Sequence, residues 1–542
     1  MYYLKRLLFF YFLVICNFSY SQDILWEKSC GGQHAEFLYD ALPTADYGFI
    51  LAGSSLSNKN GNKQDNSKGD LDYWIWKLNE KGVLEWQKSF GGSGVDLLQS
   101  VQNTNDGGFI LAGTSTSNSG GDKLENSKGQ EDFWILKLDA KGNQLWQKTI
   151  GGSGQEKLMS VLQTKEGGYL LGGTSSSNKS ALNEKGVHDV YGKTEDSKGG
   201  LDYWVVKLDF KGEIKWQKTL GGKYVDELKS IHQTADKGYI LGGYSNSPIS
   251  GDKTQECFGL NDYWVIKLDE KGNQQWQQTF GGPEDDLLFA LTPTKEGGYI
   301  VGGNSNSEAA NSKSVSKQNG TDYWVIKLDA NGTISWQKSY DYGNKDVLTS
   351  IIESEDGTFL IGGYAQSEQK NSSKTIRKDE EGINDYIALK IKANGEEIWT
   401  QTVGSKGDEI LKKLFETRDG GFILAGTSKG KASADKTSDN GGSDFWVVKI
   451  KDKDKKINQV VLVEAIPNPA TTFTNIIVGY AYENGTALLV DLNGRILQEF
   501  TLDGNRTLPI DLSNYPEGIY VVTIKTNLQT NSVKIIKGIS KN

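Results

Sequence analysis

A chain of 542 residues is too long for one small core, so we expect several folded units or a repeat array. Its 65 glycines against 8 prolines, with 36% hydrophobic and 11% aromatic residues, suit many short strands joined by turns and exclude a disordered chain. The net charge of −9, with basic residues spread along the chain, predicts no nucleic-acid partner.

The first 21 residues have the features of an export signal. A basic start, "MYYLKR", precedes the apolar run "LLFFYFLVICNF" and the small residues "SYS". We predict that residues 1–21 are removed by cleavage near Ser21 and Gln22. A lipoprotein signal at Cys16 is the less favoured alternative, because Ile15 stands where a small residue is required. No other segment is apolar enough to cross a bilayer, which predicts no transmembrane segment in the mature chain.

Three short motifs then recur seven times, mostly 60 residues apart. A tryptophan followed by Gln, Glu or Thr occurs at Trp26, Trp86, Trp146, Trp216, Trp276, Trp336 and Trp399. An aspartate that precedes an aromatic residue occurs at Asp72, Asp132, Asp202, Asp262, Asp322, Asp385 and Asp444. A glycine that ends an aromatic and aliphatic run occurs at Gly53, Gly113, Gly173, Gly243, Gly303, Gly363 and Gly426. These motifs place all 14 tryptophans inside one array.

Each repeat contains four short strand candidates separated by turn signals. In the second repeat they are "DLLQSVQN", "GFILAGTS", "DFWILKLD" and "QLWQKTIG", with "TNDGG" and "DAKGN" as turns. The third candidate is apolar on both faces, which indicates a sheet covered on both sides. Four-stranded sheets packed face to face around an axis form a β-propeller. The sequence therefore predicts an all-β protein with a seven-bladed β-propeller over residues 23–450.

The phase of the repeats predicts how the ring closes. The array begins with a fourth strand, at 24–29, and ends with a third strand, at 445–450. Seven complete blades result only if residues 24–29 pair with residues 445–450. This pairing leaves the ring without open sheet edges at its two ends.

A second domain follows the propeller. Residues 451–464, which begin with the charged run "KDKDKKINQ", are predicted to be a linker, and the repeat is lost beyond them. Alternating strands and the Asn-Gly turn of "DLNGR" predict a small C-terminal β-sandwich over residues 465–542.

Residues 465–538 contain "PNPA", "DLNGR", "LSNYPEGIYVVTI" and a final strand with lysines. With these motifs the segment resembles the type A C-terminal sorting domain of the type IX secretion system. The resemblance implies that the secretion machinery is a partner through residues 465–542. It also implies that the protein is secreted or displayed on the outer-membrane surface, with the sorting domain removed and the remainder anchored or released.

The propeller is loosely similar to pyrroloquinoline-quinone-like repeats, as in "LDEKGNQQW" at residues 268–276. The quinone enzymes have eight blades and dedicated cofactor and calcium ligands, which have no counterpart among these motifs. We therefore expect no cofactor, with calcium as the alternative.

Catalytic motifs are scarce in this sequence. His34, His188 and His232 occupy different repeat positions, and none has a partner at metal-ligand or triad spacing. No phosphate loop, zinc-protease motif or nucleophile elbow is present. We predict no catalytic or metal-binding residue, and the pattern favours a protein that is not an enzyme.

One carboxylate recurs in every repeat, at the predicted start of the innermost strand. The seven are Glu36, Asp96, Glu156, Asp226, Asp286, Asp346 and Glu409. They are predicted to ring one mouth of the central channel, where they could bind a cation or a basic ligand. The favoured interpretation is structural, because a role in holding each blade together repeats in every blade.

The loops between the second and third strands form the other candidate surface. They are residues 54–71, 114–131, 174–201, 244–261, 304–321, 364–384 and 427–443. Their repeated Ser, Asn, Lys, Asp and Gly predict a polar face that binds a glycan, another surface polymer or a protein, unless it is only a solvated rim. The function predicted is thus a surface binding or scaffold module. The alternative is a secreted polysaccharide-active enzyme, with its site near His188 and Tyr191 in the long third loop.

Overall fold

The computed structural model describes residues 22–180, 189–366, 384–418, 420–453, 462–470 and 473–538. Every regular element in these ranges is a β-strand. Within them there is no helix of the length and apolar character needed to cross a membrane. The predicted export signal, residues 1–21, lies outside the described residues.

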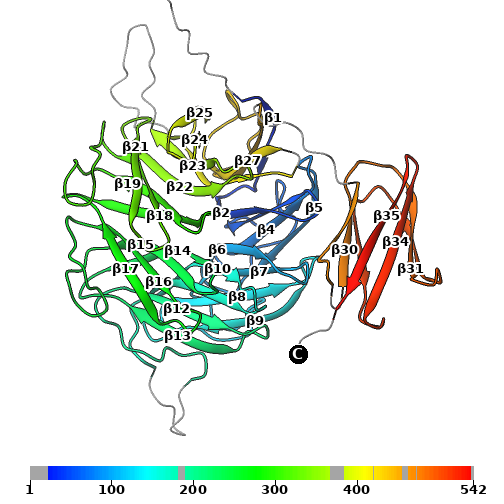
Figure 1. Cartoon of the computed structure of the whole chain (residues 1–542), viewed down its shortest axis with the longest axis horizontal. Helices are drawn as coiled ribbons and strands as arrows, with labels where there is room; N and C mark the ends of the chain where they lie inside the picture. The colour runs from blue at the N-terminus through cyan, green and yellow to red at the C-terminus, as the bar shows by residue number, and fades with distance from the viewer. Residues whose placement is uncertain are drawn as a thin grey trace, which may run out of the picture.

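Seven four-stranded antiparallel sheets surround a central axis, with the first strand of each sheet innermost (Figure 1). The first three blades comprise β2 (Glu36–Pro43), β3 (Phe49–Ser55), β4 (Asp72–Leu78) and β5 (Leu84–Phe90); β6 (Asp96–Asn103), β7 (Phe109–Ser115), β8 (Asp132–Leu138) and β9 (Gln144–Ile150); and β10 (Glu156–Gln163), β11 (Tyr169–Ser175), β12 (Asp202–Leu208) and β13 (Ile214–Leu220). The next three comprise β14 (Asp226–Gln233), β15 (Tyr239–Ser245), β16 (Asp262–Leu268) and β17 (Gln274–Phe280); β18 (Asp286–Pro293), β19 (Tyr299–Ser305), β20 (Asp322–Leu328) and β21 (Ile334–Tyr340); and β22 (Asp346–Glu353), β23 (Phe359–Gln366), β24 (Asn384–Ile391) and β25 (Glu397–Val403). The predicted seven-bladed propeller is confirmed.

The seventh blade is built from both ends of the repeat array. It contains β26 (Glu409–Glu416), β27 (Gly421–Ser428), β28 (Asp444–Lys451) and, as its outer strand, β1 (Ile24–Cys30). β1 pairs antiparallel with β28, from Ile24 opposite Ile450 to Cys30 opposite Phe445. The predicted closure of the ring by the N-terminal strand is therefore confirmed.

Aromatic side chains of the third strands hold neighbouring blades together. The ring of Tyr73 on β4 lies 4.7 Å from that of Trp134 on β8, and its hydroxyl donates to the Trp134 carbonyl at 3.0 Å. Large aromatic rings supply much of the buried area of such a core, and the buried hydroxyl has a partner. Gly113 of β7 lies beside this contact, because a Cβ there would come within 1.9 Å of the Leu97 carbonyl oxygen and 2.5 Å of the Tyr73 hydroxyl. The repeated tyrosine, tryptophan and glycine thus form the interface between blades.

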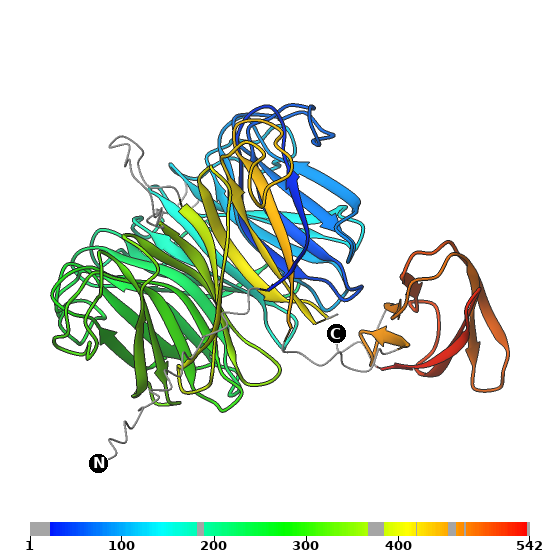
Figure 2. The ribbon, with the colours of Figure 1, turned by 90° about the horizontal axis from the view of Figure 1, so that it is seen from above.

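The C-terminal domain is a small β-sandwich, as predicted. One sheet contains β29 (Val463–Ile466), β30 (Phe473–Val478) and β33 (Thr507–Asp511). The other contains β31 (Gly485–Asp491), β32 (Ile496–Leu502), β34 (Gly518–Thr526) and β35 (Thr530–Lys537). Their inner faces share a core that includes Ile476, Leu489, Ile510, Val522 and Ile535. Figures 1 and 2 show this domain beside the first two blades, outside the ring.

Candidate functional site

The seven repeated carboxylates each occupy the first position of an innermost strand, and each is completely buried. They are Glu36, Asp96, Glu156, Asp226, Asp286, Asp346 and Glu409, all with 0% exposure. The sequence placed them correctly at one end of these strands. Since they have no exposed surface, they do not present their oxygens to solvent.

Each carboxylate accepts a hydrogen bond from the turn that leads into its own blade. The donor is the backbone N–H four residues earlier in the chain, at 2.7–2.9 Å. Asp96, for example, binds the N–H of Gly92 at 2.7 Å and the hydroxyl of Ser117 at 3.0 Å. Burial raises the pKa of Asp96, and these hydrogen bonds oppose that rise. This geometry supports the structural interpretation of the acids.

In six blades a second buried carboxylate occupies the first position of the third strand, and in the sixth blade the equivalent Asp385 is half-buried. Asp72 on β4 accepts hydrogen bonds from the N–H of Lys68 at 2.6 Å and the hydroxyl of Ser67 at 2.9 Å. A Cβ on Gly91, the first glycine of the turn, would lie 1.9 Å from Asp72 Oδ1. The glycine pair of the sequence motif therefore makes room for an aspartate.

Buried lysines of the loops between the second and third strands compensate these acids. Lys63 is 2% exposed, and burial lowers its pKa while the charges of Asp72 and Glu36 oppose that change. Its Nζ donates to the Ser57 carbonyl at 2.6 Å. Equivalent buried lysines are Lys123, Lys193, Lys253, Lys313 and Lys436. The sequence pattern placed these lysines on the polar loop face, and their burial was not predicted.

Asp346 differs from the other six acids, because two further carboxylates lie beside it. One oxygen each of Asp322, Asp341 and Asp346 lies within 4.8 Å of the others. Burial, followed by the charges of Asp341 and Asp322, raises the pKa of Asp346 to about 7, although the N–H of Tyr342 opposes this. No other group of three or more metal-ligating side chains occurs among the residues that the structure describes.

In the first five blades, the glutamine of the "WQ" motif fixes the loop between the second and third strands to its own blade. Gln147 Oε1 accepts hydrogen bonds from the indole of Trp134 at 3.0 Å and from the Leu124 N–H at 3.0 Å. Its Nε2 donates to the Asp122 carbonyl at 2.6 Å. Gln87, Gln217, Gln277 and Gln337 repeat this arrangement. The described loops of these five blades are therefore held in place by side chains that the sequence repeats.

The described part of the loop face is largely polar, although Leu56 and Leu124 are exposed in the loops of the first two blades. Five further apolar side chains are exposed in or beside the loops of the third and fourth blades. They are Val190, Tyr224, Ile249, Phe258 and Leu260, which are 40–78% exposed. Tyr224 and Ile249 come from adjacent loops, because the Tyr224 N–H donates to Ser247 at 2.9 Å and the Lys223 N–H donates to Ser250 at 2.8 Å. Neighbouring exposed apolar groups mark interaction surfaces more often than single ones do. Sequence reasoning missed this patch. Its signal in the sequence was "KYV" at residues 223–225, where the equivalent turns at 93–95 and 153–155 have "SGV" and "SGQ".

Among the described residues, His34, His232 and Tyr191 lie in different parts of the propeller. His34 is exposed in the turn before β2, and His232 lies at the other end of β14. His188 lies outside the described residues. The Tyr191 hydroxyl donates to Glu213 at 2.7 Å and also contacts the Lys148 amine, which lies over the tyrosine ring. Tyr191 is thus engaged with Lys148 on β9 of the second blade and with Glu213, which directly precedes β13 of its own blade.

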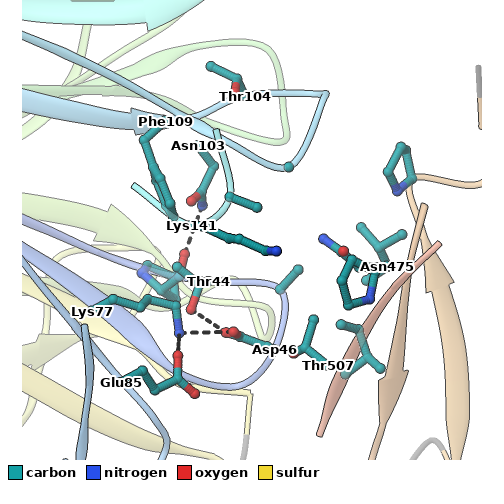
Figure 3. A pocket seen from close by; sticks show the side chains of 18 of the residues that line it. Thr44, Asp46, Lys77, Glu85, Asn103, Thr104, Phe109, Lys141, Asn475 and Thr507 are labelled. Atoms are coloured by element: carbon teal, nitrogen blue, oxygen red, sulfur yellow. Dashed lines mark hydrogen bonds and ion pairs between the residues drawn. The ribbon is translucent and has the colours of Figure 1, made fainter. Parts of the chain in front are cut away.

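A cavity of about 860 Å³ lies between the propeller and the C-terminal domain (Figure 3). On the propeller side, Lys77 forms ion pairs with Asp46 at 2.9 Å and Glu85 at 2.8 Å. Asn475 and Thr507 of the C-terminal domain line the opposite side. The cavity is therefore a space between two domains, and the ion pairs neutralise its buried lysine.

Arginines join the two domains beside this cavity. The guanidinium groups of Arg418 and Arg506 lie 4.6 and 4.5 Å from the ring centre of Tyr47. Arg506 pairs with Glu80 of the propeller, and Arg418 pairs with Glu464 of the C-terminal domain. The negative face of an aromatic ring attracts cations. Arg418 belongs to the propeller and Arg506 to the C-terminal domain, so each of the two ion pairs crosses the domain boundary.

Comparison with protein families identifies the C-terminal domain. Residues 464–538 match the family of the secretion system C-terminal sorting domain. The resemblance found in the sequence is thus confirmed, and the domain indicates export by the type IX secretion system. The match does not include the propeller.

The propeller has distant relatives. The regulatory protein FlaEY of Caulobacter vibrioides is 23% identical over 234 residues, which are 42% of this chain and 24% of that protein. The chain therefore matches about a quarter of the length of this relative. Similar solved structures include Sqt1 from Chaetomium thermophilum, at 10% identity and a TM-score of 0.38, covering 80% of this chain and 99% of that one. A puromycin hydrolase is 8% identical with a TM-score of 0.41, covering 82% and 59%. Likenesses this weak carry no argument about function.

Proposed function

We propose that the propeller is a non-enzymatic binding module, exported by the type IX secretion system and either released or kept at the cell surface. Its ligand is a glycan or another surface polymer, bound on the face formed by the loops between second and third strands. The observation that carries this proposal is the group of exposed apolar side chains on that face.

Two properties of the loop face support binding. The glutamine and lysine anchors described above fix the loop backbones, so little conformational entropy is lost when a ligand docks. The aromatic rings of Tyr224 and Phe258, which are 49% and 40% exposed, stand among serine, asparagine and lysine side chains. Exposed rings supply contact area, and the polar neighbours supply hydrogen bonds to hydroxyl groups.

The repetition of the loops also favours a polymer as the ligand. "NSKGDLDYW", "NSKGQEDFW" and "DSKGGLDYW" give three successive blades similar surfaces. A polymer with repeated units contacts several such surfaces at once, and multivalent contact raises weak affinities by effective concentration. An enzyme needs one locally distinct arrangement of reacting groups.

The test is a glycan array and a polysaccharide pull-down with residues 22–542. We expect wild-type binding to decrease at least tenfold in the double variant Tyr224→Ala, Phe258→Ala. The matched control is Phe210→Ala, because Phe210 is 60% exposed but lies in the turn between β12 and β13, at the opposite end of its blade. Equal loss in the control, or no binding by the wild type, contradicts the proposal. Turnover of a polysaccharide would establish the enzyme alternative instead.

Delivery is tested separately by ending the chain at residue 453. We expect this truncated protein to remain in the periplasm with an intact propeller, because the sorting domain lies outside the ring and has its own core. Protease accessibility on whole cells measures surface display. Normal display of the truncated chain would show that residues 462–542 do not direct export.

A further inference from the structure

The junction between the fifth and sixth blades departs from the repeat at three positions. Asp341 stands where the other six junctions have Gly31, Gly91, Gly151, Gly221, Gly281 and Gly404. Ala365 of β23 stands where the other second strands have Ser55, Ser115, Ser175, Ser245, Ser305 and Ser428. Lys317 stands where the first three loops have Ser67, Ser127 and Ser197. The first change adds a carboxylate, and the other two remove hydroxyl donors.

These changes concentrate negative charge at one point. Asp322 begins β20, Asp346 begins β22, and Asp341 lies in the turn that connects these two blades. Asp322 and Asp346 are both 0% exposed, whereas Asp341 is only half-buried. The cluster is therefore buried on two sides and open to solvent through Asp341.

Hydrogen bonds leave part of this cluster unsatisfied. Asp346 accepts the Tyr342 N–H at 2.7 Å, Asp322 accepts the Gln318 N–H at 2.7 Å, and Asp341 accepts the Asn319 amide at 2.9 Å. The buried Oδ1 atoms of both Asp322 and Asp346 have no hydrogen-bond partner among the described residues, which is also true of aspartates such as Asp96 at other junctions; here a third carboxylate, Asp341, lies beside them. Buried polar atoms normally have a partner, and buried charges are normally paired.

The serine that is missing here stabilises the charged acid in other blades. At Asp96, Asp226 and Asp286, burial raises the pKa of the carboxylate, and the serine of the second strand opposes that rise. Asp346 has Ala365 opposite it in the sheet. The nearest buried cation, Lys313, interacts with Asp322 electrostatically, but its Nζ donates to the Ser307 carbonyl at 3.0 Å. None of the three acids forms an ion pair with a described lysine or arginine.

We propose that Asp322, Asp341 and Asp346 form a calcium-binding site. Ca²⁺ takes 6–8 oxygen ligands at about 2.3–2.6 Å, so two oxygens across the ion are separated by about 4.6–5.2 Å. The three carboxylate oxygens, within 4.8 Å of one another, fit around one such ion. Water and backbone carbonyl groups complete the coordination on the open side, next to Asp341. One site is expected per chain, because the other six junctions have glycine at the position of Asp341.

The test uses residues 22–542 freed of metal by chelation. We expect calorimetry to detect one Ca²⁺ per chain with a Kd of about 10⁻⁴–10⁻³ M, the range of extracellular modules. At 10 mM Ca²⁺ the Tm of the propeller should then rise by a few degrees. Mg²⁺ should bind more weakly, because it requires shorter distances and near-ideal octahedral geometry.

The decisive variant is Asp341→Gly, which restores the residue found at the six other junctions and should therefore fold. In this variant, the heat of calcium binding and the calcium-dependent rise in Tm should both be lost. Glu308→Gln is the matched control, because it removes one exposed charge from the loop of the same blade and should bind Ca²⁺ normally.

Terbium luminescence gives an independent readout. The rings of Tyr323 and Tyr342 lie 5.5 Å apart, and each tyrosine directly follows a carboxylate of the cluster, Asp322 or Asp341. They are therefore close enough to sensitise a lanthanide bound to the cluster, and Ca²⁺ should displace it. The proposal would be overturned if calorimetry detected no heat of calcium binding in the wild type. It would also be overturned if Asp341→Gly kept the wild-type terbium luminescence.

Discussion

Glu27 of β1 accepts a hydrogen bond from the indole Nε1 of Trp446 on β28 at 2.7 Å, although 419 residues separate them in the chain. In the second blade the same bond joins Gln147 and Trp134. Glu27 also accepts the Thr437 N–H at 3.1 Å, as the glutamines do for their own loops. The N-terminal strand therefore supplies the loop anchor of the seventh blade as well as its outer edge.

Replacement of this glutamate should weaken the closure of the ring. We expect Glu27→Ala to lower the free energy of unfolding by about 2–3 kcal/mol, because it removes bonds to a charged acceptor and leaves a buried indole N–H unpaired. Glu27→Gln should cost less than about 1 kcal/mol, since glutamine performs this role in five other blades. Chemical denaturation measures both values. Equal stability of Glu27→Ala and wild type would exclude this closure contact.

Asp96 provides a test of the structural interpretation of the buried acids. Asp96→Ala should lower the free energy of unfolding by about 1–3 kcal/mol, because the Gly92 N–H and the Ser117 hydroxyl lose their acceptor. Asp96→Asn should cost about 1 kcal/mol, since an amide oxygen can accept one of these bonds. Ligand binding and calcium binding should be unchanged in both. A loss of either binding with intact stability would show that Asp96 belongs to a functional site.

The third blade lacks an ion pair that other blades have. Lys137 pairs with Asp106 at 2.8 Å, and Lys267 pairs with Asp236 at 2.9 Å. Lys207 has Glu166 at the corresponding position and donates instead to Thr164 at 2.7 Å. Burial lowers the pKa of Lys207 to about 8.

Glu166→Asp should restore the pair and raise the free energy of unfolding at pH 7 by about 0.5–1 kcal/mol. In the wild type, stability should rise as the pH increases from 8 to 10.5, because the folded chain has already released a proton that the unfolded chain retains. Glu166→Asp should flatten this rise. Urea unfolding across that pH range measures both effects, and Asp106→Glu should produce the opposite change in the second blade.

We expect His232 to make the stability of the propeller depend on pH in mild acid. Burial, and then the charge of Lys413, lower its pKa to about 4. The unfolded chain binds a proton near pH 6.5, whereas the folded chain does not, so stability falls as the pH decreases from 6.5 to 4. The contribution of this group should reach about 2–3 kcal/mol at the lower end.

His232→Gln should remove that part of the pH dependence, measured as the free energy of unfolding between pH 4 and pH 7. The control is His34→Gln, because His34 is exposed and lies in a turn. An identical pH profile for His232→Gln and wild type would show that His232 is not the titrating group.

The period of the sequence was sufficient to predict the architecture. Seven tryptophan motifs gave seven blades, and the early position of Trp26 gave the closure by β1. The acids were placed at the correct strand ends, since a residue such as Asp96 follows its glycine pair at a fixed distance. These inferences succeeded because they depend on spacing along the chain.

The remaining features depend on contacts between blades. In the sequence, Asp341 replaces the first glycine of the repeated glycine pair. The candidate for a distinct site was nevertheless placed in the long third loop. Asp341 meets Asp322 and Asp346 only because the turn between blades passes over the start of a third strand. Likewise, the exposure of Tyr224 depends on how two loops pack, which no pattern in one repeat reveals.

The pairing of β1 with β28 also determines when the ring can be completed. Ile24–Cys30 is the first strand of the array to be synthesised, and its partner Asp444–Lys451 is the last. At about 5–20 residues per second, the ribosome needs roughly 20–80 s to make the intervening chain. During that interval an early strand waits without its partner, so the closed ring is inaccessible to a partial chain. The propeller can therefore close only after β28 has been made, and β28 is the last strand before the segment that directs export.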